Sequence, residues 1–214
     1  MLDISAAFVR LNARLAPVAF VPEIRLHQAD EPIGLWELTE GEFRSEQPPP
    51  FWAFAWAGGQ ALARYVLDHP DLVAGHRVLD LAAGSGLVAI AAARAGAADV
   101  RAVEVDPWAV TAIGLNARAN DVAVTAELTD VLDGDAGSVE VVLAGDVFYS
   151  QAMADRVRRF LRGAARSGAQ VVVGDPDRAY FPHRVFRRLA SYEVPVPPAL
   201  EGVRVKPTTV WQLT

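Results

Sequence analysis

The sequence predicts an α/β protein with a Rossmann-like sheet of seven mostly parallel strands and helices on both faces. After residue 50, runs rich in Val, Ile and Leu alternate with helical segments, which implies crossover connections and a covered parallel sheet. The last two strand-like runs, 190–196 and 203–214, are joined by only a proline-rich link. Because this link has no room for a crossover helix, we expect one strand near the C-terminus to be reversed.

The separate elements follow from this alternation. Pro107 suits the first turn of a helix and Asp106 suits its N-cap, so the boundary of this helix is predicted most sharply. Helices are predicted over 86–95, 107–120 and 151–166. Before the last two strands, further strands are predicted over 76–81, 99–105, 123–128, 139–144 and 170–174.

An amphipathic segment begins the chain. Ile4, Phe8, Leu11 and Leu15 recur at helical spacing, which predicts a short helix up to Pro17. The same segment lacks the apolar core and cleavage site of a secretory signal peptide. No window approaches the roughly 18 uninterrupted apolar residues of a membrane span. These features predict a cytoplasmic protein without membrane partners.

A polar break separates this beginning from the rest of the chain. Segments 22–29 and 34–42 alternate apolar and polar residues, which favours a hairpin of edge strands. Segment 45–50, SEQPPP, is stiff and should favour the polyproline conformation. We therefore expect an N-terminal extension over 1–45 and a main domain over 46–214.

The composition limits the kinds of function. The 214 residues are 52% hydrophobic and 21% charged, as in ordinary globular proteins, and the net charge is −6. An acidic chain is a poor candidate for bulk nucleic-acid binding, which needs a basic surface. The absence of cysteine excludes disulfides, thiolate zinc sites and a cysteine nucleophile. The four histidines lack metal-ligand spacing, so no metal site is expected.

A glycine loop follows the strand predicted at 76–81. Its sequence GSGLVA, at 84–89, fits the dinucleotide pattern, with Glu104 about 20 residues beyond it. That pattern alone would suit an NAD-dependent oxidoreductase. However, Asp80 ends the strand just before the loop, where its carboxylate would repel a pyrophosphate and attract an ammonium group. S-adenosylmethionine carries a cationic amine and a cationic sulfonium and has no phosphate, so Asp80 favours this cofactor.

Two more acidic residues follow the next two strands. Glu104 could accept hydrogen bonds from ribose hydroxyls, and Asp130 could accept one from an adenine amino group while Val131 packs on the ring. Since Asp80, Glu104 and Asp130 end successive strands, they should meet at the carboxyl edge of the sheet, where ligands bind.

From about Trp52 onward, these features resemble the class I S-adenosylmethionine-dependent methyltransferases. The family loop reads D-x-G-x-G-x-G, whereas here it reads DLAAGSG, so Ala82 replaces the first glycine and is expected to keep a negative φ. The resemblance implies binding of S-adenosylmethionine and release of S-adenosylhomocysteine. The cofactor-binding residues that it implies are Trp56, Gly59, Gln60, Asp80, Ala82, Gly84, Gly86, Glu104, Val105, Asp130, Val131 and Asp146.

Three segments narrow the resemblance. The D-x-F-Y motif at 146–149, the segment PPFWAFAWAGGQALARYVLDHP and the segment GDPDRAYFP are similar to those of the electron transfer flavoprotein β-subunit lysine methyltransferases. This similarity implies a protein substrate with an exposed lysine, with that β-subunit as the expected partner. It also implies catalytic roles for Asp146 and Tyr149, and substrate contacts from Trp52, Phe148 and Tyr149.

Several alternatives stay open at this stage. Trp52, Trp56 and Phe148 could equally pack in the core, because aromatic side chains dominate cores. Asp175 and Arg178 could contact substrate or pair with each other. The methyl acceptor could also be a ribosomal protein or a small amine, since fold does not fix function. An NAD-binding oxidoreductase or a non-catalytic binding module is the alternative of a different class.

Overall fold

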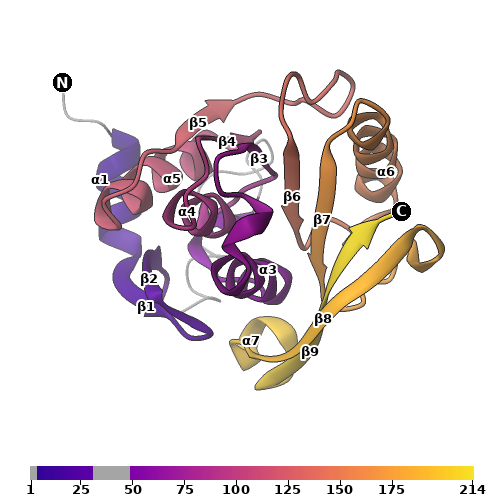
Figure 1. The fold of residues 1–214 in the computed structure, drawn as a ribbon. Coiled ribbons are helices and arrows are strands. Elements are labelled where there is room, and N and C mark those ends of the chain that lie inside the picture. Colours follow the sequence, from indigo (N-terminus) through magenta and orange to yellow (C-terminus); the bar gives the residue numbers. More distant parts are fainter. Residues whose placement is uncertain (1–3, 31–48) are drawn as a thin grey trace.

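The computed structural model describes residues 4–30 and 49–214, which form a seven-stranded sheet and a separate two-stranded sheet (Figure 1). The strand order of the large sheet is β5-β4-β3-β6-β7-β9-β8. The strands are β3 (Arg77–Leu81), β4 (Asp99–Glu104), β5 (Thr125–Leu128), β6 (Val141–Gly145), β7 (Gln170–Asp175), β8 (Phe186–Pro195) and β9 (Val205–Leu213).

The direction of the strands confirms the predicted fold. Strands β3 to β7 pair in parallel, and β9 pairs antiparallel with both β7 and β8. The proline-rich link between β8 and β9 holds only the short helix α7 (Pro198–Glu201). One reversed strand near the C-terminus is therefore confirmed.

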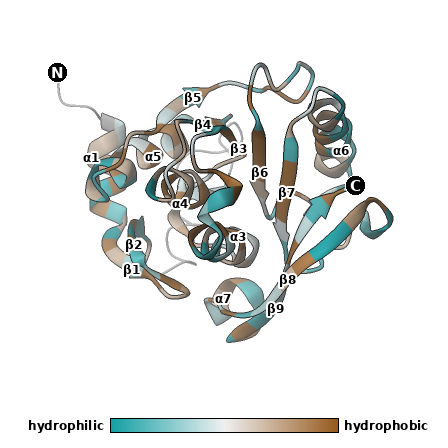
Figure 2. Ribbon diagram, viewed as in Figure 1, coloured by the Kyte–Doolittle hydropathy of each residue, from teal (hydrophilic) through white to brown (hydrophobic). Residues whose placement is uncertain are grey.

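Helices cover the two faces of the sheet unequally. Helices α3 (Ala57–Asp68), α4 (Leu87–Arg94) and α5 (Pro107–Ala119) lie over one face, and α6 (Gln151–Arg166) lies over the other (Figure 1). The alternation of side chains along each strand produces this division: Val78 packs with α3 and α4, whereas Leu79 packs with α6. Both faces are apolar, so β6 and β7 are predominantly brown in Figure 2.

Local capping explains why two helix starts were predictable. Asp106 precedes α5 and accepts a hydrogen bond from the Trp108 amide at 2.8 Å, with Pro107 in the first turn. Ser150 caps α6 in the same way by accepting from the Met153 amide at 3.4 Å. No helix in the described ranges is long and apolar enough to cross a bilayer.

The N-terminal helix prediction is partly wrong. Helix α1 (Ile4–Asn12) ends early, and Leu15 and Pro17 lie in strand β1 (Arg14–Val18). The Asn12 side-chain amide donates to the Phe8 carbonyl and satisfies one of the carbonyls left free at the helix end. Spacing at 4, 8, 11 and 15 could not detect this end, because an alternating strand can also carry an apolar residue at position 15.

The hairpin also forms with a different partner. Strand β2 (Val21–Gln28) confirms the strand predicted at 22–29, but it pairs antiparallel with β1. The predicted partner at 34–42 and the predicted boundary at residue 45 lie outside the described residues.

Two buried amides, Asn116 in α5 and Asn120 at its C-cap, hold this hairpin against the main domain. Asn116 accepts hydrogen bonds from the His27 amide at 2.8 Å and donates to the Ser85 carbonyl at 2.8 Å. Asn120 accepts from the Arg25 amide and donates back to the Arg25 carbonyl. Because Ser85 belongs to the glycine loop, the N-terminal hairpin and this loop are held by one side chain.

Candidate active site

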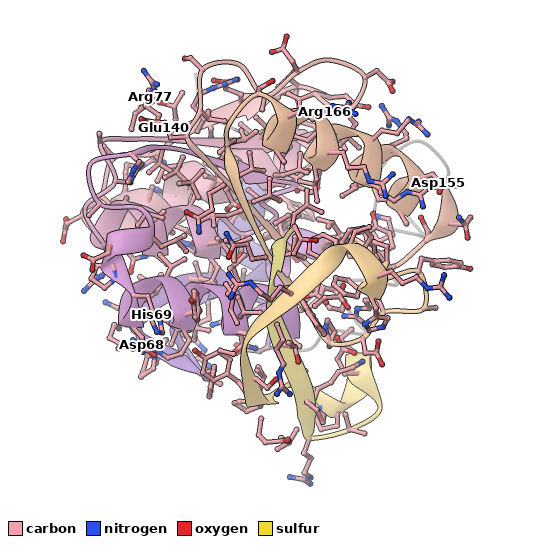
Figure 3. The ribbon with its side chains drawn as sticks, turned by 45° about the vertical axis from the view of Figure 1, so that its right-hand side comes forward. Asp68, His69, Arg77, Glu140, Asp155 and Arg166 are labelled. Carbon is pink, nitrogen blue, oxygen red and sulfur yellow. The ribbon has the colours of Figure 1, made fainter. Side chains whose placement is uncertain are left out.

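A cavity of about 350 Å³ opens where β3, β4, β5 and β6 end, a volume typical of small-ligand pockets. The edge of the sheet opposite the cavity is the one where β3 and β6 begin. It carries a surface ion pair between Arg77 and Glu140, both labelled in Figure 3. The predicted site residues that line the cavity are Trp52, Trp56, Gly59, Asp80, Ala82, Gly84, Glu104, Val105, Asp130, Val131, Asp146 and Tyr149.

Three predicted residues do not line this cavity. Phe148 is fully buried on the α6 side of the sheet, where it packs edge-on against Phe181, so its core alternative is the one observed. Gln60 is buried and bonds the Ala55 and Pro195 carbonyls. Gly86 has a φ of 79° at the N-cap of α4, so its left-handed backbone turns the loop into the helix without lining the cavity. The motif predicts these three residues by their position in the sequence, which does not reveal which way each one faces in the fold.

The glycine loop contains a strained alanine. The φ of Ala82 is +53°, so the expectation of a negative φ is wrong. The chain leaves β3 through a left-handed turn that glycine adopts freely and alanine adopts at a cost of about 1 kcal/mol. Asp146, at the end of β6, also has a positive φ, of 56°. Both residues line the cavity, which is where such strain is concentrated in functional sites.

Glu104 ties the glycine loop to the end of β4. One carboxylate oxygen accepts from the Gly84 amide at 2.8 Å, and the other accepts from the Val105 amide at 2.9 Å. These two bonds hold the carboxylate beside the cavity while leaving further lone pairs for a ligand.

Asp80 is a buried acid at the floor of the cavity. Its carboxylate accepts from the Ala89 amide of α4 at 2.8 Å. Burial raises the pKa of Asp80 to about 8; the bond from Ala89 opposes this rise, and the charge of Glu104 adds to it. Neither Asp80 nor Glu104 has a cationic partner within residues 4–30 and 49–214. The site therefore holds two acidic groups whose ionised forms a cationic ligand would stabilise.

Asp130 differs because its charge is already balanced. One oxygen accepts from the Leu132 amide at 3.1 Å, and the other pairs with Arg156 of α6 at 2.9 Å. Val131 lies beside it and is half-buried on the cavity wall. A ligand that meets Asp130 here also meets an apolar surface.

Asp146 is held by three groups of the protein. One oxygen accepts from the Gly58 and Gly59 amides at the start of α3, and the other accepts from Arg178 at 2.7 and 3.0 Å. Burial raises the pKa of Asp146, and the charge and hydrogen bonds of Arg178 oppose this rise. Since both oxygens are engaged, Asp146 has little capacity left for a direct bond to a substrate amine.

Glycines let α3 approach the ends of β6 and β7 closely enough for this arrangement. A Cβ on Gly145 would lie 2.8 Å from the Gly59 Cα, and a Cβ on Gly174 would overlap the Gly58 carbonyl. Larger residues would push the first turn of α3, and with it two amides, away from Asp146.

Aromatic side chains form the mouth of the cavity. The Trp56 indole donates to the Phe51 carbonyl at 2.9 Å, and the rings of Phe51 and Tyr149 lie 5.7 Å apart. Tyr149 is exposed at this mouth, whereas Trp52 is buried behind it. Partial burial raises the pKa of Tyr149, so its hydroxyl keeps its proton at neutral pH.

Two relatives that align with most of this chain have the same name. Electron transfer flavoprotein β-subunit lysine methyltransferases from Danio rerio and Xenopus laevis are 37% and 35% identical to it. The first alignment covers 91% of this chain and 77% of the relative, and the second covers 96% and 85%. The chain belongs to this family. Membership in a family of lysine methyltransferases decides against the oxidoreductase and binding-module alternatives.

More distant similarities agree with this family. The profile of the ribosomal protein L11 methyltransferase family (PrmA) matches residues 60–165, which include the glycine loop and the strand ends around it. The structure of magnesium protoporphyrin IX methyltransferase from Synechocystis, solved with bound S-adenosylmethionine, shares the fold with a TM-score of 0.55 and 12% identity. That alignment covers 85% of this chain and 96% of the other.

The methyltransferase site contains charged residues that sequence reasoning missed. For Arg178 the sequence allows substrate contact or pairing with Asp175; in the structure its amide donates to Asp175, whereas its guanidinium pairs with Asp146 and Glu201. Lys206 pairs in turn with Glu201. Glu201 and Lys206 lie in the C-terminal hairpin, and no local motif marks them.

Proposed function

We propose that this chain transfers the methyl group of S-adenosylmethionine to a lysine of the electron transfer flavoprotein β-subunit. The supporting observation is that two acids, Asp80 and Glu104, line a ligand-sized cavity and have no cationic partner among the described residues. The ionised forms of these acids suit a ligand with an ammonium and a sulfonium better than one with a pyrophosphate. The acceptor follows from the names of the family's members.

The lining residues suit the parts of this cofactor in turn. Asp80 would attract the methionine amine, and Glu104 would accept from the ribose hydroxyls. Asp130 would accept from the adenine amino group with Val131 against the ring. Gly84 and the strained Ala82 allow the backbone to approach the ligand. The bound cofactor would supply the electrophilic methyl group.

The acceptor side is formed by the aromatic mouth and Asp146. Methyl transfer is an in-line displacement, so the enzyme must aim the lysine nitrogen at the methyl carbon. The exposed Tyr149 hydroxyl is available to bond the amine, and Trp56 offers an aromatic wall to the cation. Because Asp146 is engaged by Arg178 and two amides, we assign it an indirect role: its charge attracts the lysine, and its bonds hold the start of α3.

The test measures transfer of radiolabelled methyl groups to the purified β-subunit. Tyr149→Phe should lower kcat about tenfold or more and leave the KM for the cofactor within about twofold, because the lost hydroxyl contacts only the acceptor. Tyr180→Phe is the matched control: Tyr180 is exposed but lies outside the cavity lining, so this variant should match the wild type. No transfer to the β-subunit by the wild-type protein would refute the proposal.

The same assay addresses one further candidate. The match to the ribosomal protein L11 methyltransferase profile favours a ribosomal acceptor as the second possibility, but it ends at residue 165, before Arg178 and the C-terminal hairpin. Ribosomal protein L11 and small amines therefore serve as competing acceptors. Faster transfer to either would change the assigned substrate and keep the cofactor assignment. The cytoplasmic location stays a prediction.

A further inference from the structure

A chain of four charged side chains leads from the cavity to the C-terminal hairpin. Arg178 bonds Asp146 at 2.7 Å and Glu201 at 2.7 and 3.2 Å, and Glu201 also pairs with Lys206. The side chains of Asp146, Arg178, Glu201 and Lys206 are 10%, 19%, 4% and 23% exposed. They come from four separate elements or loops, and Lys206 is the only lysine of the sequence. We call this set the four-residue ion-pair network.

The four-residue ion-pair network fixes where the positive charge of Arg178 lies. Its Nε and both terminal nitrogens donate to carboxylates, and its guanidinium carbon lies 5.9 Å from the Trp56 ring centre. Burial alone would raise the pKa of Glu201, but the hydrogen bonds from Arg178 and Lys206 outweigh burial and keep this pKa below its ordinary value. Glu201 is therefore an anion that binds the guanidinium edge next to the one that faces Asp146.

Negative and positive residues alternate along the four-residue ion-pair network, and its net charge is zero. Asp146 and Arg178 line the cavity, whereas Glu201 and Lys206 lie behind them. Removing a single member leaves a net charge beside the place where the acceptor lysine must enter. Other ionisable groups near this place are Asp175 on β7, Tyr149 at the mouth, and Glu104 and Asp80 on the cavity wall. Replacing Glu201 or Lys206 by a neutral side chain leaves each of these groups in place.

We propose that Glu201 is a positioning residue of the methyl-transfer site: through Arg178 it sets the protonation state of the acceptor lysine. This inference rests on the proposed function. The lysine must lose its proton to water before its lone pair forms the N–C bond; as that bond forms, the C–S bond breaks and its electron pair stays on sulfur. The fixed positive charge of Arg178 near the amine favours the neutral form of the acceptor lysine. The negative charge of Glu201, which is paired with the same guanidinium, reduces this effect.

The test is the pH dependence of kcat, which reports groups of the enzyme–substrate complex. Glu201→Gln removes a negative charge, so the bound amine should lose its proton more readily and the rise of kcat should move to lower pH. Arg178→Met removes a positive charge and should move the rise to higher pH. Each shift should be on the order of one pH unit for a charge several ångströms away.

Lys206→Met covers the case in which Arg178→Met does not fold, and it should give a smaller shift to higher pH. Glu127→Gln is the matched control: it breaks a 2.9 Å ion pair with Arg101 away from the cavity and should leave the profile in place. A purely structural role would lower activity without opposite shifts. Unshifted profiles, or shifts in one direction for Glu201→Gln and Lys206→Met, would overturn this inference. An inactive wild-type protein would overturn the proposed function instead.

Discussion

Binding of the cofactor product should release a proton from Asp80. With a pKa of about 8 in the free protein, about ten of every eleven Asp80 carboxyls carry a proton at pH 7. The amine of S-adenosylhomocysteine favours the ionised carboxylate, so binding should expel about 0.9 proton at this pH. At pH 9 the carboxyl is already ionised, and release from this group should fall to about 0.1 proton.

Titration calorimetry at pH 7 in two buffers of different ionisation enthalpy measures this number. Asp80→Asn should abolish the buffer dependence and weaken binding about tenfold or more, because the amine loses its partner. Asp175→Asn is the control: burial raises the pKa of Asp175 to about 7, but this residue does not line the cavity, so the variant should still release the proton. Equal binding enthalpies in both buffers for the wild-type protein would refute the reasoning.

The same pKa has a consequence for stability. The pKa of Asp80 is raised above its unfolded value near 3.9, so its contribution to folding is lost as pH rises through about 8. Between pH 7 and pH 9 the free energy of unfolding of the wild-type protein should fall by about 1 kcal/mol, a loss that Asp80→Asn avoids. Over this range the Tm of the wild type should therefore fall by about 2–4 °C relative to that of the variant, as measured by thermal melts.

Two further predictions concern the framework of the site. Gly145→Ala should cost about 1–3 kcal/mol and weaken cofactor binding, since its methyl group would press on Gly59; denaturant unfolding and calorimetry measure both, and an unchanged protein would contradict the close approach. Asp106→Ala should cost about 1 kcal/mol through the lost N-cap, whereas Asp106→Asn, which also caps, should cost less. Equal losses in denaturant unfolding would contradict the capping explanation.

Much of the fold could be predicted because its signals are local. The predicted helix at 151–166 is observed with the same bounds, since Ser150 caps it and Gly168 follows its end. The predicted end of the N-terminal helix is wrong because residue spacing alone does not show where the helix stops and β1 begins. Phe148 does not line the cavity as its neighbours Asp146 and Tyr149 do, because its ring packs on the other side of the sheet.

The sequence by itself determined the order of the elements and the acids that end them. Asp80, Glu104 and Asp130 had to share one edge of the sheet, because parallel strands joined by crossovers bring their carboxyl ends together. Only the tertiary structure decided which of these charges stay unbalanced. Asp130 is paired with Arg156, and Asp146 with Arg178, through contacts between residues 26 and 32 positions apart. Such pairing depends on packing between elements, which local sequence patterns do not encode.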